Sequence, residues 1–433
     1  MSKLAELVDY IEFPRMIEMR QKFPRPRVEH ISQEVQKQLS LSGIRERIRP
    51  GQEIAITGGS RGIDHIAQII KETADFVKSC GANPFIIPAM GSHGGATAEG
   101  QTEVLNALGI TEEYCGCPIR ATMDTVFLGY TENFHLPVYE DRYANEADGV
   151  ILINRIKPHP SFSGKIESGI CKMAVIGVGK QRGAAFCHSR GMTCMSESLQ
   201  EIASYLFQNA NIIGALGIIE NAFDETARLA GMVTEEILEK EPLLLKEAYD
   251  NFPQIYFRQY DCLLVEEIGK NISGAGMDAM VISRYTHDGV PQDKRQQTIC
   301  VLDLTEETHG NACGMGLADV APKRFAEKVD FLNTYPNNLT SRIFGSCKMP
   351  MIVDDDKTAI QAAIHGCMGI DWRKVRLIWI KNTLDIGRIV ISEALYEEWS
   401  KNRDQYPNME PVGDWFEMKF DLEGNLERLP EKI

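Results

Sequence analysis

Short apolar runs alternate with amphipathic segments through the first part of the chain. Runs of strand length lie at 53–57 and 84–89, and each continues into a glycine-rich loop. Apolar residues at helical spacing follow the first loop, and a second such segment spans 98–108. This repeated order of strand, loop and helix predicts a parallel α/β sheet. Ligands bind such sheets beyond the carboxyl ends of the strands, which is where Arg61 and His93 fall.

The same alternation predicts elements along the rest of the chain. Further strands are expected at 151–153, 212–219, 262–265, 298–304 and 375–380, and helices at 195–209 and 234–249, the latter kinked or split by Pro242. Residues 1–50 have the pattern of a helical lead-in, and 111–148 that of a polar, irregular stretch. Because the pattern restarts near Tyr260, we predict two α/β domains with mainly parallel sheets, residues 1–260 and 261–433, and an active-site cleft between them.

Composition limits the class of protein. The chain has 433 residues, of which 43% are hydrophobic and 25% charged, as in soluble globular proteins. Its formal charge of −15 argues against nucleic acid as a partner. The N-terminus lacks the apolar core of a signal peptide, and no apolar run is long enough to span a membrane. The 11 cysteines include no CxxC pair, so we expect reduced thiols and a cytoplasmic location. Because no apolar run is long enough to span a membrane, we expect no membrane partner.

The forty residues from Ile151 to Arg190 concentrate the polar chemistry of the chain. A buried-strand pattern leads into a loop broken by prolines and glycines that carries two histidines and three lysines: His159, His188, Lys165, Lys172 and Lys180. Titratable groups on a flexible loop after a strand suit an anionic or metal-containing ligand. The alternative is a basic surface loop without chemistry.

A second glycine loop, Thr57–Ile63, is similar to the phosphate loop of short-chain dehydrogenases. This pattern favours a competing hypothesis, an NAD(P)-dependent oxidoreductase. Two features argue against it. Asp64 stands where the last glycine of that loop would be, and no tyrosine is followed four residues later by the lysine that such enzymes use.

Histidine positions add a chemical hypothesis. His93 and His159 each follow a predicted strand, which favours a site with two acid–base histidines, and His188 could bind a metal as imidazole. The chain has no HExxH motif, so a hydrolytic zinc site is not expected. His309 fits a site residue and a turn equally well. The other histidines are expected to be structural: His30, His65, His135, His287 and His365.

Taken in order along the chain, these elements resemble the lactate racemase-like family of nickel-pincer racemases and epimerases. The resemblance rests on a strand and loop with Arg61, a Gly-Ser-His93 loop, His159 and Ser163–Gly164 after a strand, Lys172 before Met-Ala-Val-Ile-Gly, and then His188. It covers residues 50–190 well and the C-terminal half only in outline.

The resemblance implies a cofactor and a role for each residue. The cofactor is the nickel-pincer nucleotide, pyridinium-3-thioamide-5-thiocarboxylic acid mononucleotide with nickel. Lys172 would tether it, and His188 would be the protein ligand of the metal. His93 and His159 would be the acid–base pair. Arg61 and Lys270 would bind the substrate, and Arg61 would contact the carboxylate of the substrate.

The implied reaction is racemisation or epimerisation of a 2-hydroxy acid through removal and return of hydride at the carbon that bears the hydroxyl. The N-terminal domain would carry the cofactor and catalytic histidines, and the C-terminal domain would close over the substrate. Partners would be a small hydroxy acid and the enzymes that synthesise the cofactor. The sequence leaves the oligomeric state open, a homo-oligomer included.

The chain also departs from the family pattern. Gly58 replaces an acidic residue, the loop reads Gly-Ser-His-Gly instead of Gly-Thr-His-Arg, and Ile-Cys171 replaces Gly-Pro before the lysine. The first two changes imply a substrate other than lactate, and the third leaves Lys165 and Lys180 as alternative tethers. A binding protein that kept the scaffold without the chemistry is a further alternative.

Overall fold

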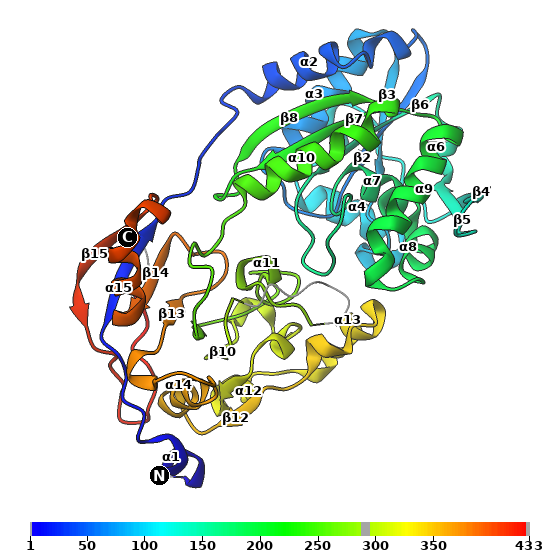
Figure 1. The fold of residues 1–433 in the computed structure, drawn as a ribbon. Coiled ribbons are helices and arrows are strands. Elements are labelled where there is room, and N and C mark those ends of the chain that lie inside the picture. The colour runs from blue at the N-terminus through cyan, green and yellow to red at the C-terminus, as the bar shows by residue number, and fades with distance from the viewer. Residues whose placement is uncertain (1, 287–294, 430–433) are drawn as a thin grey trace. The chain divides into compact units, whose positions relative to one another are not determined.

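The computed structural model describes residues 2–286 and 295–429, and these form two compact units (Figure 1). Residues 24–252 make one unit, called here the central unit. The stretch up to Phe23 joins residues 253–429 in the other, called here the terminal unit. Each unit contains a mainly parallel sheet with helices, so the predicted fold class is confirmed. The division differs from the predicted one at the N-terminus, which was expected to belong with residues 24–260.

The central unit is built on a five-stranded sheet in the order β3-β2-β6-β7-β8. Its strands are β2 (Glu53–Gly58), β3 (Asn83–Pro88), β6 (Gly149–Arg155), β7 (Ile212–Glu220) and β8 (Thr226–Val233). The first four in the sheet are parallel, and β8 pairs antiparallel with β7. β3 contains Pro84 and Pro88 and stands at the sheet edge, where a strand without two N–H donors is tolerated.

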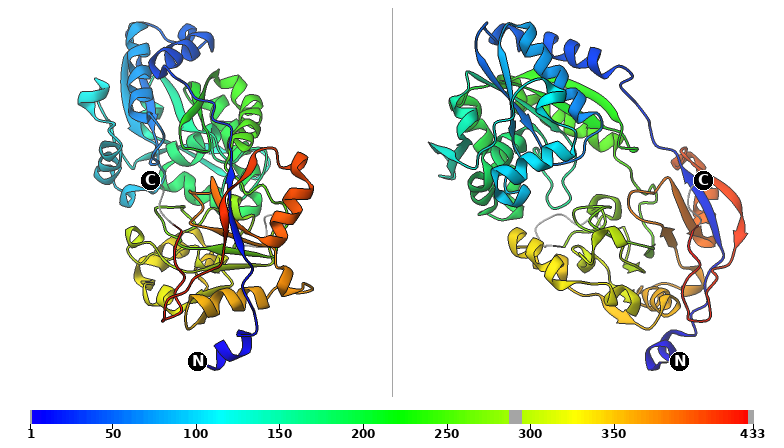
Figure 2. Two further views of the ribbon diagram at one scale, coloured as in Figure 1. Left: turned by 90° about the vertical axis from the view of Figure 1, so that its left-hand side faces the viewer. Right: turned by 180° about the vertical axis from the view of Figure 1, so that it is seen from behind.

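Helices cover both faces of this sheet, because successive strand residues point to opposite sides. Ile54 and Ile151 pack with α2 (Ile31–Leu41), α3 (Ile66–Ser79) and α4 (Ala98–Ala107). Ala55 and Leu152 pack with α7 (Ile170–Lys172), α9 (Met195–Asn209) and α10 (Ile237–Asn251). Figures 1 and 2 show the blue helices and the green helices on the two sides of the strands. α10 continues through Pro242 as one helix and is not split.

The stretch 111–148 was expected to be irregular, and this expectation was wrong. It contains α5 (Glu112–Cys115), the antiparallel hairpin β4 (Thr125–Tyr130) and β5 (Pro137–Asp141), and α6 (Arg142–Glu146). β4 has the sequence TVFLGY, in which three apolar residues stand in a row, so it lacks the alternation of apolar and polar residues that marks a half-buried strand. Cross-strand contacts stabilise the hairpin instead, such as the rings of Phe127 and Tyr139, 5.5 Å apart.

The terminal unit has an eight-stranded sheet in the order β12-β11-β10-β9-β13-β14-β1-β15. The strands are β1 (Met16–Gln21), β9 (Cys262–Val265), β10 (Thr298–Val301), β11 (Val320–Pro322), β12 (Met351–Val353), β13 (Leu377–Ile380), β14 (Arg388–Ser392) and β15 (Met409–Phe416). Its helices are α1 (Lys3–Val8), α11 (Ala279–Ile282), α12 (Lys323–Glu327), α13 (Phe331–Ser341), α14 (Asp356–His365) and α15 (Glu393–Lys401).

One strand of this sheet corrects the predicted helical lead-in over 1–50. Residues 3–8 and 31–41 are helical, but β1 is a strand between β14 and β15, and Figure 2 shows it in blue beside the red β15. β1 pairs only with strands more than 360 residues away in sequence, such as Met16 with Ser392. Local periodicity carries no information about such a partner.

Candidate functional site

Three of the predicted site residues follow three adjacent parallel strands. Arg61 follows β2, His93 follows β3 and His159 follows β6, in a sheet where β2 lies between the other two. Parallel strands end at the same edge of a sheet, so the loops that carry these residues leave from one edge. The three residues therefore follow strands that end at one edge of the sheet, and their roles stay predictions.

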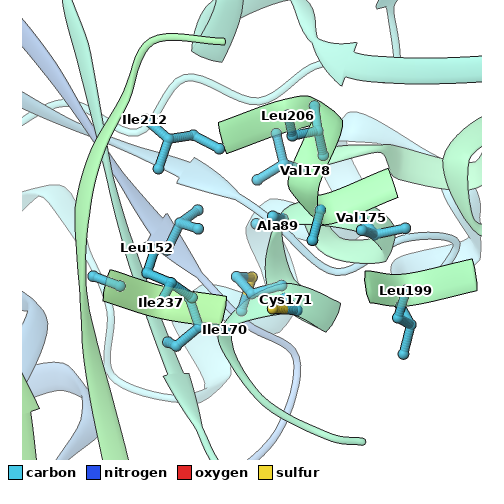
Figure 3. Packing of buried hydrophobic residues seen from close by; sticks show 14 of the residues in the cluster. Ala89, Leu152, Ile170, Cys171, Val175, Val178, Leu199, Leu206, Ile212 and Ile237 are labelled. Carbon is cyan, nitrogen blue, oxygen red and sulfur yellow. The ribbon is translucent and has the colours of Figure 1, made fainter. Parts of the chain in front are cut away.

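Lys172 and His188 come from the helical segments that follow. Lys172 ends α7, a π-helix spans Met173–Val178, and α8 (Lys180–His188) ends at the histidine. α7 is anchored by packing: Ile170 and Cys171 are fully buried and lie in one cluster with Leu152 and Ile237 (Figure 3). A single turn of helix is not stable alone, so this packing holds the backbone of Lys172 in place.

Close backbone contact joins the His93 loop to the π-helix. The N–H of Gly91 donates to the carbonyl of Gly177 at 3.4 Å. Gly91 has φ +62°, and a Cβ on Gly177 would lie 2.8 Å from the carbonyl oxygen of Ala89. Side chains at these two positions would be strained or would clash, so glycine permits this approach. π-helical turns are rare and occur often at functional sites.

Positive charges connect the five predicted site residues of the central unit, because each of them takes part in a pKa shift with at least one other. Burial, followed by the charges of Arg61 and Lys157, lowers the pKa of Lys172 to about 8. Burial also lowers the pKa of His159 well below its ordinary value, with further lowering by Lys172, Lys157, His188 and Arg61.

His93 belongs to the same group. Partial burial lowers the pKa of His93, and the positive charges of Arg61 and Lys172 lower it further, while a hydrogen bond to Met90 opposes them. Interactions between charges weaken with distance, so residues that shift one another's pKa values lie near one another. Arg61 and Lys172 therefore lie within electrostatic range of both His93 and His159, and His188 lies within range of His159.

Two cations of this group have no partner of opposite charge. Within residues 2–286 and 295–429, the side chains of Arg61 and Lys172 have no hydrogen bond and no ion pair. Unpaired like charges near one another disfavour the folded state unless a ligand compensates them. The arrangement therefore suits an anionic ligand.

Hydrogen bonds fix the tautomers of two histidines. Nδ1 of His93 lies 2.8 Å from the carbonyl oxygen of Met90, and Nδ1 of His188 lies 2.6 Å from that of Ala184. A carbonyl can only accept, so each Nδ1 carries the proton and each neutral ring has its lone pair at Nε2. An Nε2 lone pair is what a proton acceptor needs at His93 and what a metal ligand needs at His188.

Sequence reasoning missed two buried glutamates behind this group. Glu167 accepts the N–H of His159 at 2.7 Å, and Glu241, from α10, accepts the N–H of Cys171 at 2.8 Å. Each is 1% exposed. Glu167 is the only acidic residue between Ile151 and Arg190, a signal that could have identified it. Glu241 lies far away in sequence and gave no such signal.

The alternative tethers differ from Lys172. Lys180 is fully buried, 2.9 Å from a carboxylate oxygen of Asp141, and it also donates to the carbonyl of Pro88 and to Gln101. Its amine is therefore engaged. Lys165 lies exposed in the His159 loop. Of the three lysines, only Lys172 is both unpaired and electrostatically coupled to Arg61 and the histidines.

The remaining predicted residues lie elsewhere. Lys270 belongs to the terminal unit, where its Nζ donates to the carbonyl of Gly274 at 2.6 Å. His309, in the same unit, ends a short 3-10 helix with φ 49°, as a turn residue does. His287 lies outside the described residues. The role of Lys270 stays a prediction.

The loop Thr57–Ile63 differs from a dinucleotide site at the start of the next helix. Asp64 accepts the N–H of Thr226 at 2.8 Å, and its own N–H donates to Glu220 at 2.8 Å. Two carboxylates thus lie at the beginning of α3. They oppose the binding of a pyrophosphate there by charge repulsion.

In residues 2–286 and 295–429, no three His, Cys, Asp or Glu side chains are grouped so that they could hold a metal ion. No helix within those ranges has both the length and the apolar character to cross a membrane.

Comparison with known proteins found matches among solved structures and none among family models or curated sequences. Among solved structures, the chain is similar to the lactate racemase apoprotein from Thermoanaerobacterium thermosaccharolyticum, with 12% sequence identity and a TM-score of 0.45. The match covers 78% of this chain and 97% of that one.

Proposed function

We propose that this chain is a racemase or epimerase of a 2-hydroxy acid that uses a nickel-pincer nucleotide. One observation carries the proposal: Arg61, His93, His159, Lys172 and His188 form one electrostatically coupled group in the central unit. A carboxylate-binding arginine, two histidines, a tether and a metal ligand are the parts that this reaction needs.

The chemistry of the side chains fits the cofactor. Lys172 is half-buried and unpaired, and a pKa of about 8 gives it a substantial neutral fraction near neutral pH, as covalent attachment requires. His188 would contribute one nitrogen ligand through Nε2, and the sulfur donors of the cofactor suit nickel. The positive charges of Arg61 and Lys157 favour its anionic groups. When bound, the cofactor supplies a hydride acceptor.

The protein would bind and orient the substrate. Arg61 would bind the carboxylate through two parallel N–H···O bonds. Nε2 of His93 would accept the proton of the substrate hydroxyl, and His159, as the second acid–base group, would supply a proton from the opposite face of the substrate when hydride returns to the other face of the carbon. Lys270 and closure of the second domain over the substrate remain proposals carried by the resemblance alone.

Mass spectrometry with nickel analysis tests the cofactor. The protein is produced together with the enzymes that synthesise the cofactor, and the intact protein and its peptides are analysed. We expect a covalent adduct on Lys172 with about one nickel per chain, as one four-coordinate site requires. Lys172→Arg should lack the adduct, and Lys165→Arg, the matched control, should keep it. An unmodified Lys172 without nickel, under conditions that load an authentic family member, contradicts the assignment.

A substrate screen tests the reaction. The loaded protein is incubated with single enantiomers of 2-hydroxy acids, and the appearance of the opposite enantiomer is measured by chiral chromatography. Tight binding of NAD by the purified protein would instead favour the oxidoreductase. If the double variant His93→Ala/His159→Ala turns over a detected substrate as fast as the wild type, the two histidines are not catalytic. That result would favour a binding protein that kept the scaffold without the chemistry.

A further inference from the structure

His93 lies on an exposed loop, but a buried side chain holds the backbone of this loop. Nε2 of Gln101, from α4, donates to the carbonyl of Gly91 at 2.9 Å and to the carbonyl of His93 at 3.3 Å. Gln101 is fully buried, whereas His93 is exposed. One amide group therefore fixes two carbonyls of the turn 91–93.

The residues after His93 pack closely against the first turn of α4. A Cβ on Gly94 would lie 2.5 Å from the carbonyl carbon of Gly100, and a Cβ on Gly100 would lie 2.1 Å from the carbonyl oxygen of Gly94. Side chains at these two positions would clash with the backbone, so glycine permits the contact. α4 thus supports the loop on both sides of His93.

Lys180 sets the orientation of the Gln101 amide. Nζ of Lys180 donates to Oε1 of Gln101 at 3.1 Å. An ammonium group can only donate and a backbone carbonyl can only accept. One assignment of the amide therefore satisfies all three contacts, with its oxygen toward Lys180 and its NH₂ group toward the His93 loop.

Lys180 itself occupies an unusual position. It is fully buried, lies 2.9 Å from a carboxylate oxygen of Asp141 and donates to the carbonyl of Pro88, the last residue of β3. Its φ of +55° is rare for a residue with a side chain. A buried ammonium is costly even when it is paired, and an apolar side chain can often replace it without loss of stability. Packing alone therefore does not account for a lysine here.

The place of Lys180 in the chain connects two parts of the site. Lys180 follows Lys172 by eight residues and precedes His188 by eight, on the segment proposed to carry the cofactor. Its contacts with Pro88 and Gln101 join this segment to the His93 loop. The hydrogen bond between Gly91 and Gly177 joins the same two segments.

We propose that Gln101 and Lys180 are positioning residues that hold His93 in place relative to the segment of Lys172 and His188. The inference rests on the proposed function. Gln101 acts through its NH₂ group on the backbone of the His93 loop, and Lys180 acts by orienting that amide. Proton transfer itself stays with His93 and His159.

The variant Gln101→Glu separates positioning from packing. Glutamate has nearly the same shape and still accepts from Lys180, but it turns an oxygen instead of an NH₂ group toward the carbonyls of Gly91 and His93. Nuclear magnetic resonance of the cofactor-free protein, labelled with ¹⁵N-histidine, follows the ring of His93, whose signals are assigned with His93→Gln. We expect these signals to shift or broaden in Gln101→Glu.

Gln361→Glu is the matched control. Gln361 is 4% exposed, and its Nε2 donates to the carbonyl of Ile11 in the terminal unit. This variant should leave the His93 signals unchanged. Signals of His93 that are identical in folded Gln101→Glu and the wild type would overturn the role of Gln101.

A double variant tests Lys180 and also serves if Gln101→Glu does not fold. Lys180→Met with Asp141→Asn removes both buried charges and leaves the Gln101 amide without the donor that orients it. We expect the His93 signals to shift or broaden here as well. Unchanged signals would overturn the role of Lys180.

Turnover by the loaded enzyme gives a second readout. Activity is expressed per bound nickel, so that a loss of folded protein does not count. Gln101→Glu should lower kcat about 10- to 100-fold, because a displacement of about 1 Å can cost about 10²-fold in rate. KM should change less than about threefold, since Arg61 still binds the carboxylate.

The two readouts separate this inference from the proposed function. An unchanged kcat in Gln101→Glu would overturn the positioning role while the function stands. If no substrate is turned over by the wild type, the proposed function fails, and the resonance experiment still decides whether Gln101 and Lys180 hold the His93 loop.

Discussion

Glu241 accepts the backbone N–H of Cys171 at 2.8 Å, and this contact stands at the beginning of the helix that carries Lys172. Glu241 comes from α10, seventy residues further along the chain. A carboxylate at a helix start satisfies an N–H that has no partner within the helix. The side chain is 1% exposed, and burial raises the pKa of Glu241 to about 7.

This raised pKa predicts a pH dependence of stability. The folded state holds the proton of Glu241 more tightly than the unfolded state, so its contribution to stability is complete below the unfolded pKa of about 4.3 and is lost as the pH rises through about 7. Glu241→Gln cannot ionise. Between about pH 5.5 and pH 8 the wild type should therefore lose about 2 kcal/mol more free energy of unfolding than the variant, since one pKa unit corresponds to about 1.4 kcal/mol.

Urea unfolding followed by circular dichroism measures this difference. Tryptophan fluorescence is an internal control, because all four tryptophans, Trp372, Trp379, Trp399 and Trp415, lie in the terminal unit. Equal pH dependence in the variant and the wild type would show that Glu241 does not titrate in this range.

Lys172 should be the most reactive of the lysines in its segment. At about pH 8 roughly half of its amines are neutral, compared with about 1 in 250 for a lysine of ordinary pKa. Limited acylation followed by peptide mass spectrometry should modify Lys172 before the exposed Lys165. Arg61→Gln removes a nearby positive charge, so it should raise the pKa of Lys172 and slow this reaction. Faster modification of Lys165 would contradict the lowered pKa.

The buried pair of Lys180 and Asp141 predicts a test of folding. Lys180→Met leaves the Asp141 carboxylate buried without its cation and should cost about 3–5 kcal/mol of unfolding free energy. The double variant Lys180→Met with Asp141→Asn removes both charges and should recover part of this loss, because asparagine can still accept the N–H groups of Tyr143 and Ala144. Thermal unfolding measures the stability of the single and the double variant relative to the wild type. Additive losses in the double variant would show that the two side chains do not interact.

Arg61 should determine substrate affinity. Loss of a charge-assisted, two-point contact to a carboxylate costs about 1.5–3 kcal/mol, so Arg61→Gln should raise KM about 10- to 100-fold with a smaller effect on kcat. Arg61→Lys keeps the charge without the planar fork and should recover only part of the affinity. Arg45→Lys, an exposed arginine of the same unit, is the control. An unchanged KM in Arg61→Gln would place the substrate carboxylate elsewhere.

The sequence determined the elements that depend on local periodicity. The apolar runs of β2, β3 and β6 and the helical spacing of α9 fall where they were predicted, and the loops after the strands carry Arg61, His93 and His159. A strand and the loop after it are adjacent in the chain. For this reason, the parallel order alone put these three residues at one edge of the sheet.

Only the tertiary structure decided the features that depend on distant partners. β1 joins the terminal unit because it pairs with β14 and β15, and Glu241 reaches Cys171 across seventy residues. The environments of Lys172 and Lys180, one unpaired and the other bound to Asp141, follow from packing between separate elements. Contacts between residues far apart in sequence leave no local pattern, because they form only when the whole unit folds.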